Sequence, residues 1–420
     1  MKFKQSAQQN QRIERITPHH LIVGIDIAKF THVARATDYR GIERGAYLSF
    51  SNDQEGFEKL FQWMQALQIQ FHKTDVIFGV EPTGHYWFNL ALWLQEKQLE
   101  LVLVNPFQVK RNKENRDNSP TKNDVKDALV IADMVKNGYY SDLYLHTGPF
   151  QALRQLVNTR DYISKQASSI VNQIYRWTDI YFPEFQQVFK DITSKTALAT
   201  LAEFAHPSDL CTLSVQEVIV GWKKRLKRAG SHKVAVALLH AAQRTVGSPE
   251  SVEEAKLSLS MLLQQLQLFH DQMELLKEKI HHILQTIPAT KSLRSIKGIH
   301  DITLAALYSE AGDFSRFAHG NQLLRLAGLH LSENSSGIYK GQVKITKRGR
   351  PGLRKILFIA VFQMVSVNPE FRALHQHNKR VKHMTGMKSI MKLCGKLARM
   401  LVAMSKKGSD YDVCKVNSAA

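Results

Sequence analysis

Four carboxylates have the residue types and positions that a metal site for phosphoryl transfer needs. Asp26 interrupts the apolar run "LIVGIDIAK", and Glu81 ends the run "VIFGVEPTG". A charge in such a strand is costly unless it has a partner or a cation. Asp124 and Asp127, in "KNDVKDAL", are three residues apart and so share one helix face. Carboxylates that meet above one edge of a sheet repel one another, but their oxygens suit Mg²⁺, and two such ions support phosphoryl transfer.

Each carboxylate also has a structural interpretation. Asp26 can be a satisfied acid at a strand end, and Glu81 can be a turn residue. Asp124 can cap its helix, and Asp127 can pair with a neighbouring lysine. Spacing alone does not join the four residues into one site.

A pair of small hydroxyls lies in a strongly basic segment near the C-terminus. The stretch "SENSSGIYKGQVKITKRGRPGLRK" contains Ser335 and Ser336, followed by seven Lys or Arg residues and no acid. Ser and Gly form turns, and a charge run is commonly a solvated face. The alternative is a serine nucleophile, which needs a base because a hydroxyl is a weak nucleophile. The cations around it would then bind nucleic-acid phosphates; the candidates are Lys344, Lys347, Arg348, Arg350 and Arg354.

The composition favours a polyanionic partner. The 420 residues contain 57 Lys and Arg against 37 Asp and Glu, a formal net charge of +20. Such an excess favours nucleic acid first and an anionic membrane surface second. No run of about 18 apolar residues is present, so we expect no membrane-spanning helix. The three cysteines, Cys211, Cys394 and Cys414, are far apart, and we expect reduced thiols in a cytoplasmic protein.

The length predicts two or three domains. Strand patterns alternate with amphipathic helices up to residue 138, which predicts a mixed sheet with helices on its faces. After it, helical periodicity dominates. The expected organisation is a flexible basic tail (1–19), an α/β catalytic domain (20–145), a helical region (146–248), a coiled coil (249–288), a mainly helical C-terminal domain (289–408) and a tail (409–420).

The coiled coil is predicted from one long apolar seam. Apolar residues recur at alternating spacings of three and four from Val252 to Ile287, over about five heptads. The seam can join two chains or fold back on a partner helix of the same chain. The alternative is a helix packed within its own domain.

These motifs resemble those of the DEDD transposases of bacterial insertion sequences, a group that includes the Piv-type DNA invertases. The N-terminal matches are "GIDIAK", "EPTGHY", "VNPFQVK" and "KNDVKDALVIADM". The C-terminal matches are "IKGIHDITLAALYSEAGDFSRF", "LLRLAGL", "SSG" and "ITKRGRPGLRKIL". The resemblance covers most of the chain from about residue 20 to 407.

The resemblance implies a site-specific DNA recombinase, or transposase, with a RuvC-like (RNase H-type) domain. It implies that Asp26, Glu81, Asp124 and Asp127 bind Mg²⁺ and that a C-terminal serine attacks DNA. It further implies donor and target DNA as substrates, a structured guide RNA encoded by the element, and a homo-oligomer, a dimer or tetramer that we place at the coiled coil. In related motifs the shared serine lies ten residues before the Ile of "I-[ST]-K-R-G", which favours Ser335 over Ser336.

Two rival functions stay open at this point. A metal-dependent nuclease or junction resolvase would use the same carboxylates without a serine. A non-catalytic nucleic-acid scaffold would need neither the carboxylates nor Mg²⁺.

Overall fold

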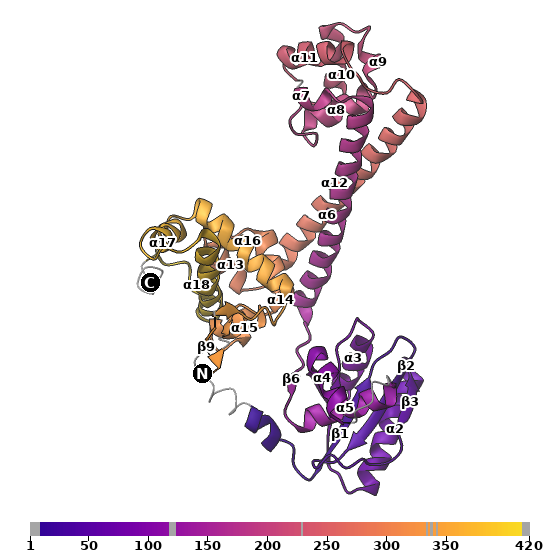
Figure 1. Cartoon of the computed structure of the whole chain (residues 1–420), viewed down its shortest axis with the longest axis vertical. Coiled ribbons are helices and arrows are strands. Elements are labelled where there is room, and N and C mark those ends of the chain that lie inside the picture. Colours follow the sequence, from indigo (N-terminus) through magenta and orange to yellow (C-terminus); the bar gives the residue numbers. More distant parts are fainter. Residues whose placement is uncertain are drawn as a thin grey trace. The chain divides into compact units, whose positions relative to one another are not determined.

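The computed structural model describes residues 9–116, 123–227, 230–332, 335–336, 339–341 and 343–413. The chain divides into two compact units, Met1–Leu145 and His146–Ala420 (Figure 1). The first unit is mixed α/β, and the second is mainly helical. This confirms the coarse fold class expected from the sequence and is compatible with a RuvC-like first domain.

The first unit is built on a six-stranded mixed sheet in the order β3-β2-β1-β4-β5-β6. β1, β4 and β5 are parallel to one another. The three other pairs are antiparallel: β2 with β1, β3 with β2, and β6 with β5. The strands are β1 (His20–Asp26), β2 (Thr31–Thr37), β3 (Leu48–Ser51), β4 (Asp75–Val80), β5 (Glu100–Val104) and β6 (Tyr140–Asp142).

Helices cover both faces of this sheet. On β1, Leu21, Val23 and Ile25 share a core with α2 (Gln54–Gln70) and α3 (Trp87–Glu96). Ile22 faces the other way, into a core with α4 (Pro106–Arg116) and α5 (Asp124–Lys136). A strand with both faces buried reads as a continuous apolar run, which is why this strand was visible in the sequence.

The first unit differs from the sequence analysis in two elements and in its N-terminal segment. Strand β6 and helix α4 were not predicted as elements. Residues 1–8 of the predicted tail lie outside the described residues, but part of the remainder is packed. Ile16 is buried, and Arg15 Nη2 lies 2.6 Å from Glu100 Oε1.

The second unit contains two long helices that pack side by side, α6 (Gly148–Tyr181) and α12 (Val252–Gln285) (Figure 1). They run antiparallel, because Trp177 Nε1 near the end of α6 donates 2.9 Å to Ala255 O near the start of α12. The helices between them in sequence form the head, which shares one core with α6 and α12. They are α7 (Phe185–Val188), α8 (Lys195–Glu203), α9 (Pro207–Leu210), α10 (Val215–Arg225) and α11 (His232–Gln243).

The predicted seam of α12 faces the protein interior. Ala255, Leu259, Leu266 and Ile280 are buried, and residues between them on the seam are partly buried. The helix that packs against α12 is α6 of the same chain. This arrangement agrees both with a seam that folds back on a partner helix and with a helix packed within its own domain, and the coiled coil stays a prediction.

The C-terminal part packs around α14, α16 and α18 in one apolar core. Its elements are α13 (Ala289–Arg294), α14 (Asp301–Ala311), η1 (Phe314–Arg316), α15 (Gly320–Leu326), β7 (Leu331–Ser332), β8 (Ser335–Ser336), β9 (Tyr339–Lys340), β10 (Lys344–Ile345), α16 (Pro351–Val367), α17 (Pro369–Arg380) and α18 (Gly386–Lys407).

Two sequence expectations concern the rest of this part. The predicted tail from 409 is anchored at Tyr411, whose amide donates 2.8 Å to Ser295 Oγ, while Cys414 lies outside the described residues. Within the described residues, no single helix is long and apolar enough to cross a membrane. Only the pair α16 and α17, bent by 99°, reaches that length and composition together. α16 buries Leu353, Leu357 and Val361 in the core.

Candidate active site

Asp26 and Glu81 lie at neighbouring positions on adjacent parallel strands. The register pairs Ile25 of β1 with Val80 of β4, and each carboxylate is the next residue along its strand. Adjacent strands are about 4.8 Å apart, so the two backbones end side by side. Both residues are half-buried.

The two carboxylates share the face of the sheet that carries α5. Side chains alternate along a strand, so Asp26 lies on the same face as Gly24, and Glu81 continues the alternation from Gly79. A Cβ added to Gly24 would lie 2.0 Å from the carbonyl oxygen of Ala128 on α5. One added to Gly79 would lie 2.5 Å from Val135 Cγ2. Both strands therefore place an acid two residues after the glycine that α5 covers.

Gly24 and Gly79 are positioning residues that the sequence analysis missed. They are partners in the β1–β4 register, so together they let α5 lie close to the sheet. A signal was present in the sequence, because "GID" and "GVE" repeat the pattern glycine, apolar residue, acid at two strand ends.

Helix α5 begins at the same end of the sheet. Its N-cap is Asn123, whose Oδ1 accepts 3.0 Å from the Val125 amide. Asp124 is exposed in the first turn, whereas Asp127 is 4% exposed. Gly41, just after the end of β2 that pairs with the start of β1, meets Lys136 and Asp133 near the end of α5. The first turns of α5, with Asp127, therefore lie toward the end of β1 that carries Asp26. The structure thus brings Asp26, Glu81 and Asp127 to one face and one edge, with Asp124 at its rim.

The donor set suits a hard divalent cation, because all four side chains offer carboxylate oxygens. Across the described residues, however, no three His, Cys, Asp or Glu side chains are grouped closely enough to hold a metal ion.

The serine pair lies in a small ribbon of strands. β7 pairs with β10, and the next residues outward form a second antiparallel pair, β8 with β9. In this register Ser335 is the backbone partner of Lys340, and Ser336 is the partner of Tyr339. Gly337, expected in the turn of this segment, lies outside the described residues.

The five predicted phosphate-binding cations fall into two groups. Lys344, Lys347 and Arg348 are exposed around the base of the ribbon. Arg354 Nη1 instead donates to the carbonyl oxygens of Ala327 at 2.9 Å and Lys347 at 3.2 Å. Arg350 donates from Nη1 to Glu310 O. These two arginines fix the backbone of residues 343–350, which we call the basic loop, and so hold the three exposed cations in place.

The same loop is tied to a cluster of arginines at the end of α14. Three consecutive carbonyl groups there each accept a guanidinium N–H: Ser309 from Arg154, Glu310 from Arg350, and Ala311 from Arg316. The C-terminal end of a helix carries partial negative charge, which favours such cations. The sequence analysis missed this cluster, because nothing local in the sequence marks these carbonyls as acceptors.

His146 lies buried beside these arginines. Burial, followed by the charges of Arg154, Arg350 and Arg316, lowers the pKa of its imidazole to about 4. The imidazole is therefore neutral at pH 7, and it adds no further positive charge to the cluster.

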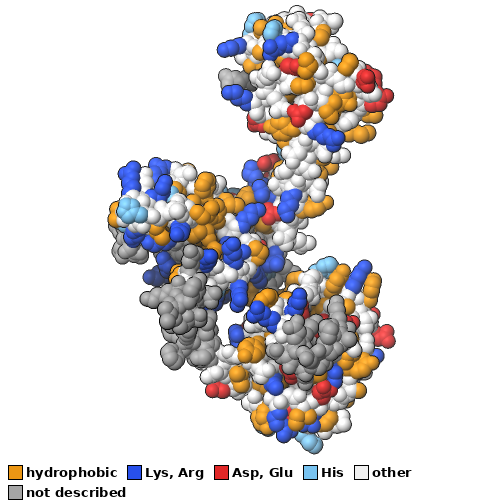
Figure 2. All heavy atoms as spheres, in the orientation of Figure 1, with side chains coloured by type: hydrophobic (Ala, Val, Ile, Leu, Met, Phe, Trp, Pro, Cys, Tyr) orange, Lys and Arg blue, Asp and Glu red, His pale blue; other side chains and the backbone are white. Residues whose placement is uncertain are grey.

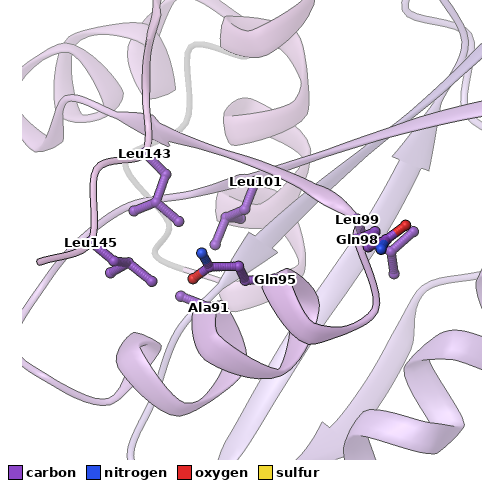
Figure 3. Close-up of a pocket in the computed structure, with 7 residues that line it drawn as sticks. All are labelled: Ala91, Gln95, Gln98, Leu99, Leu101, Leu143 and Leu145. Carbon is purple, nitrogen blue, oxygen red and sulfur yellow. The ribbon is translucent and has the colours of Figure 1, made fainter. Parts of the chain in front are cut away.

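A hollow of about 220 Å³ on the first unit is lined by leucines together with Gln95 and Gln98 (Figure 3). Its walls come from α3, the start of β5 and Leu143 and Leu145 after β6. Leu99 and Leu101 place it at the amino-terminal end of β5, whereas Asp26 and Glu81 lie at the carboxyl ends of their strands. It is not part of the candidate site.

Two family models match the chain, one described as "Transposase" over residues 23–183 and one described as "Transposase IS116/IS110/IS902 family" over residues 290–376. Together they cover more than half of the sequence. The chain belongs to this family of insertion-element transposases. It is therefore an enzyme that recombines DNA.

Named relatives agree with this assignment. The transposase is 22% identical over 294 residues to an insertion element IS110 uncharacterized 43.6 kDa protein of Streptomyces coelicolor, covering 69% of this chain and 72% of the relative. It is 32% identical over 110 residues to the pilin gene-inverting proteins of Moraxella lacunata and Moraxella bovis, covering 26% of this chain and 32% of each relative.

The matched regions include the acidic edge of the first unit and the serine ribbon of the second. The first contains the sheet from Val23, α5 and α6 of this transposase, and the second contains the serine ribbon, the basic loop and α16. The head, α12 and α18 lie outside both.

Proposed function

We propose that this transposase cuts and rejoins DNA with Mg²⁺ held by Asp26, Glu81, Asp124 and Asp127, and with Ser335 as the nucleophile. The observation that supports the acidic half is the shared register of Gly24 and Gly79, which aims the two strand-end acids at the face covered by α5. Members of DEDD transposase families generally use divalent metal ions.

The chain's own contribution to the metal site is a set of oxygen ligands from three elements. Asp26 and Glu81 come from adjacent strands, and Asp127 with Asp124 comes from the first turns of α5. When bound, a divalent cation would neutralise negative charge that develops on the reacting phosphoryl group.

The serine half of the proposal is a phosphoryl transfer through Ser335. Its Oγ attacks a phosphorus atom of DNA and forms an Oγ–P bond, while the bond from that phosphorus to the leaving deoxyribose oxygen breaks. The hydroxyl proton passes to a base, and the leaving oxygen takes up a proton. Lys344, Lys347 and Arg348, exposed at the base of the ribbon, are the groups that would neutralise the attacked phosphate.

A guide RNA is part of the proposal. The net charge of +20 supplies affinity for phosphate backbones without sequence information. Such a protein suits recognition in which base pairing chooses the DNA. Recombination of a minimal DNA pair by protein freed of RNA would count against this part, whereas a single structured RNA recovered by sequencing would support it.

Self-association is also proposed, with a surface different from the predicted seam. Four apolar residues of α12 are more than half exposed, namely Leu257, Met261, Leu268 and Leu275. Met261, Leu268 and Leu275 are spaced by seven residues, so they form a second stripe along one side of the helix. We propose this stripe as the contact between two copies.

Trapping of a covalent adduct tests the serine half most directly. Wild-type protein incubated with end-labelled donor DNA and Mg²⁺ should give a protein–DNA band on a denaturing gel, and EDTA should abolish it. Ser335→Ala should give no band, while Ser336→Ala should retain one. The reverse pattern moves the role to Ser336. Adducts from the double variant would remove serine chemistry and restore the Mg²⁺-dependent nuclease.

A further inference from the structure

A second basic surface lies where α17 and α18 meet, and we call it the α17–α18 corner. It consists of Lys379, Arg380, Lys382, Lys388 and Lys392, all exposed. None of the ion pairs found among the described residues includes any of them. Figure 2 shows Lys, Arg and His side chains gathered over α17.

The sequence offers little local compensation for this charge. Between Lys340 and Lys407 the only acid is Glu370, against 17 Lys or Arg residues. The Glu370 carboxylate accepts 3.3 Å from the hydroxyl of Tyr411, so it is already engaged away from the corner. A solvated charged face normally mixes both signs, and this surface does not.

A buried polar network holds the corner in one shape. Ser389 Oγ is fully buried and lies 2.9 Å from His375 Nδ1 and 3.2 Å from Asn378 Nδ2. Lys392 Nζ donates 3.3 Å to Asn378 Oδ1, and the Met384 amide donates 2.9 Å to Asn378 O. The end of α17, the connecting turn and the start of α18 are thus fixed together.

The network also keeps the ammonium groups of Lys382 and Lys392 close to each other. Partial burial and the neighbouring Lys382 ammonium lower the pKa of Lys392. Like charges held together in this way are unfavourable in the free protein. An anion placed between them would relieve the repulsion.

The corner is formed by elements other than those of the serine ribbon. The basic loop leads into the start of α16, and α17 begins after its end, where Asn368 accepts from the amides of Glu370 and Phe371 at 3.1 Å. α16 has 17 residues, which makes it about 25 Å long. In Figure 1, β9 and α17 accordingly lie at different ends of this helical part. The second family match ends at residue 376, before all five cations.

We infer that the α17–α18 corner is a second DNA-backbone surface, which holds duplex DNA at a distance from the reacting phosphate. The inference rests on the proposed function in one respect, that the serine ribbon holds the reacting part of the DNA. The α16 helix that lies between them in sequence is about as long as seven base pairs, and a duplex of 30 base pairs is several times longer, so one duplex can reach both surfaces. Lys and Arg bind phosphates without reading bases, so the corner contributes affinity and register.

Salt-dependent binding tests this surface. We would replace Lys379, Arg380, Lys382 and Lys388 by Gln, leaving Lys392 in place because it bonds to Asn378. The affinity for a 30-base-pair duplex, measured by fluorescence anisotropy between about 50 and 200 mM salt, should fall at least about 10-fold, with a slope shallower by about 2 to 4. A charge-matched control replaces four exposed lysines elsewhere in the second unit, Lys165, Lys190, Lys195 and Lys279, and should keep the wild-type slope.

Single substitutions guard against loss of fold in the quadruple variant. Lys379→Gln and Lys388→Gln should each reduce the slope by about 1. Equal slopes for corner and control variants would overturn the inference. So would a loss confined to RNA binding, measured with a duplex RNA of the same length.

Adduct formation separates this inference from the proposed function. At saturating DNA, the corner variants should form the serine adduct at the wild-type level, because none of the substituted side chains belongs to the ribbon or to the basic loop. A shallower slope in a protein that forms no adduct even as wild type would keep the corner as a DNA surface and reject the serine mechanism.

Discussion

Gly24 of β1 and Gly79 of β4 are register partners in a parallel ladder, and α5 lies directly over both. A Cβ on Gly24 would lie 2.0 Å from the Ala128 carbonyl oxygen and 2.5 Å from the Ala132 amide nitrogen. At Gly79 the nearest atoms are side-chain methyl groups of Val135 and Ile131. The helix backbone can yield less than a side chain can, so the two positions differ in tolerance.

Gly24→Ala should therefore destabilise the first unit more than Gly79→Ala. We expect a loss of about 3 kcal/mol or more in the free energy of unfolding at Gly24 and about 1 to 2 kcal/mol at Gly79. Urea unfolding followed by circular dichroism measures both. Gly386→Ala is the control, because a Cβ there meets nothing within 4 Å, and it should be neutral within about 0.5 kcal/mol. Equal losses at Gly24 and Gly386 would contradict the close approach of α5.

Asp26→Asn and Asp127→Asn should each abolish recombination while leaving the fold intact. Each removes a carboxylate from the proposed Mg²⁺ site with little change in volume, and losing several kcal/mol of charge stabilisation lowers the rate by at least about 100-fold. Joining of donor ends is the assay. Glu96→Gln, on an exposed position of α3, should recombine as wild type. Wild-type joining by either Asp variant would reject the metal site.

Substitutions on the two sides of α12 should have opposite consequences. Leu266 is 2% exposed, so Leu266→Glu should cost about 3 to 5 kcal/mol of stability by burying a charge. Leu268→Glu with Leu275→Glu lies on the exposed stripe and should leave stability unchanged but lower the oligomer mass in light scattering. An unchanged mass with an intact fold would remove the stripe as a contact between copies.

His146 should make stability depend on pH in the acid range. Its pKa is about 4 in the folded chain, against 6.5 in the absence of burial and the neighbouring arginines. Below pH 6.5 the unfolded chain binds a proton that the folded chain excludes, so stability is complete above 6.5 and falls as the pH drops toward 4. His146→Gln should reduce the loss of unfolding free energy between pH 7.5 and 5.0. His282→Gln, at an exposed position of α12, should keep the wild-type pH dependence.

Much of the first unit could be predicted because its local patterns are strong. The buried run at β1 is covered on both faces, and α5 begins with an N-cap at Asn123. β6 has three residues, too few for alternation to show, and it forms because Tyr140 pairs with Val104 of β5. Helix α4 has only a weak apolar pattern, with Val109 buried.

In the second unit, local patterns predict the helices but not which helices pack together. The periodicity of α12 predicted a long helix with one apolar seam, but not which helix would cover it. Its partner α6 ends 70 residues before α12 starts, and such pairing is decided by packing of the whole unit. The exposed stripe at Leu268 and Leu275 was also visible as apolar residues, but only burial distinguishes it from the seam.

The carboxylates of the site could be predicted individually, because charges are rare at the ends of buried strands. Their common face could not be derived from the acids alone, since it depends on the glycine pair and on the course of α5. The arginine cluster at the end of α14 could not be predicted from the sequence for a similar reason. Arg154, Arg316 and Arg350 come from three distant segments, and their acceptors are ordinary backbone carbonyls.

The segment that forms the head departs from the end of α6 and returns to the start of α12 at adjacent points. The Ser248 amide donates 2.9 Å to Ile180 O, and Gly247 lies so near Tyr181 that a Cβ would come within 2.1 Å of its carbonyl oxygen. The segment 182–247 is therefore an insertion in a helical hairpin that a short turn could close. Evolution or an experimenter could exchange it as a cassette, provided that the replacement covers the apolar side chains of α6 and α12 that share its core, such as Ile174 and Leu259.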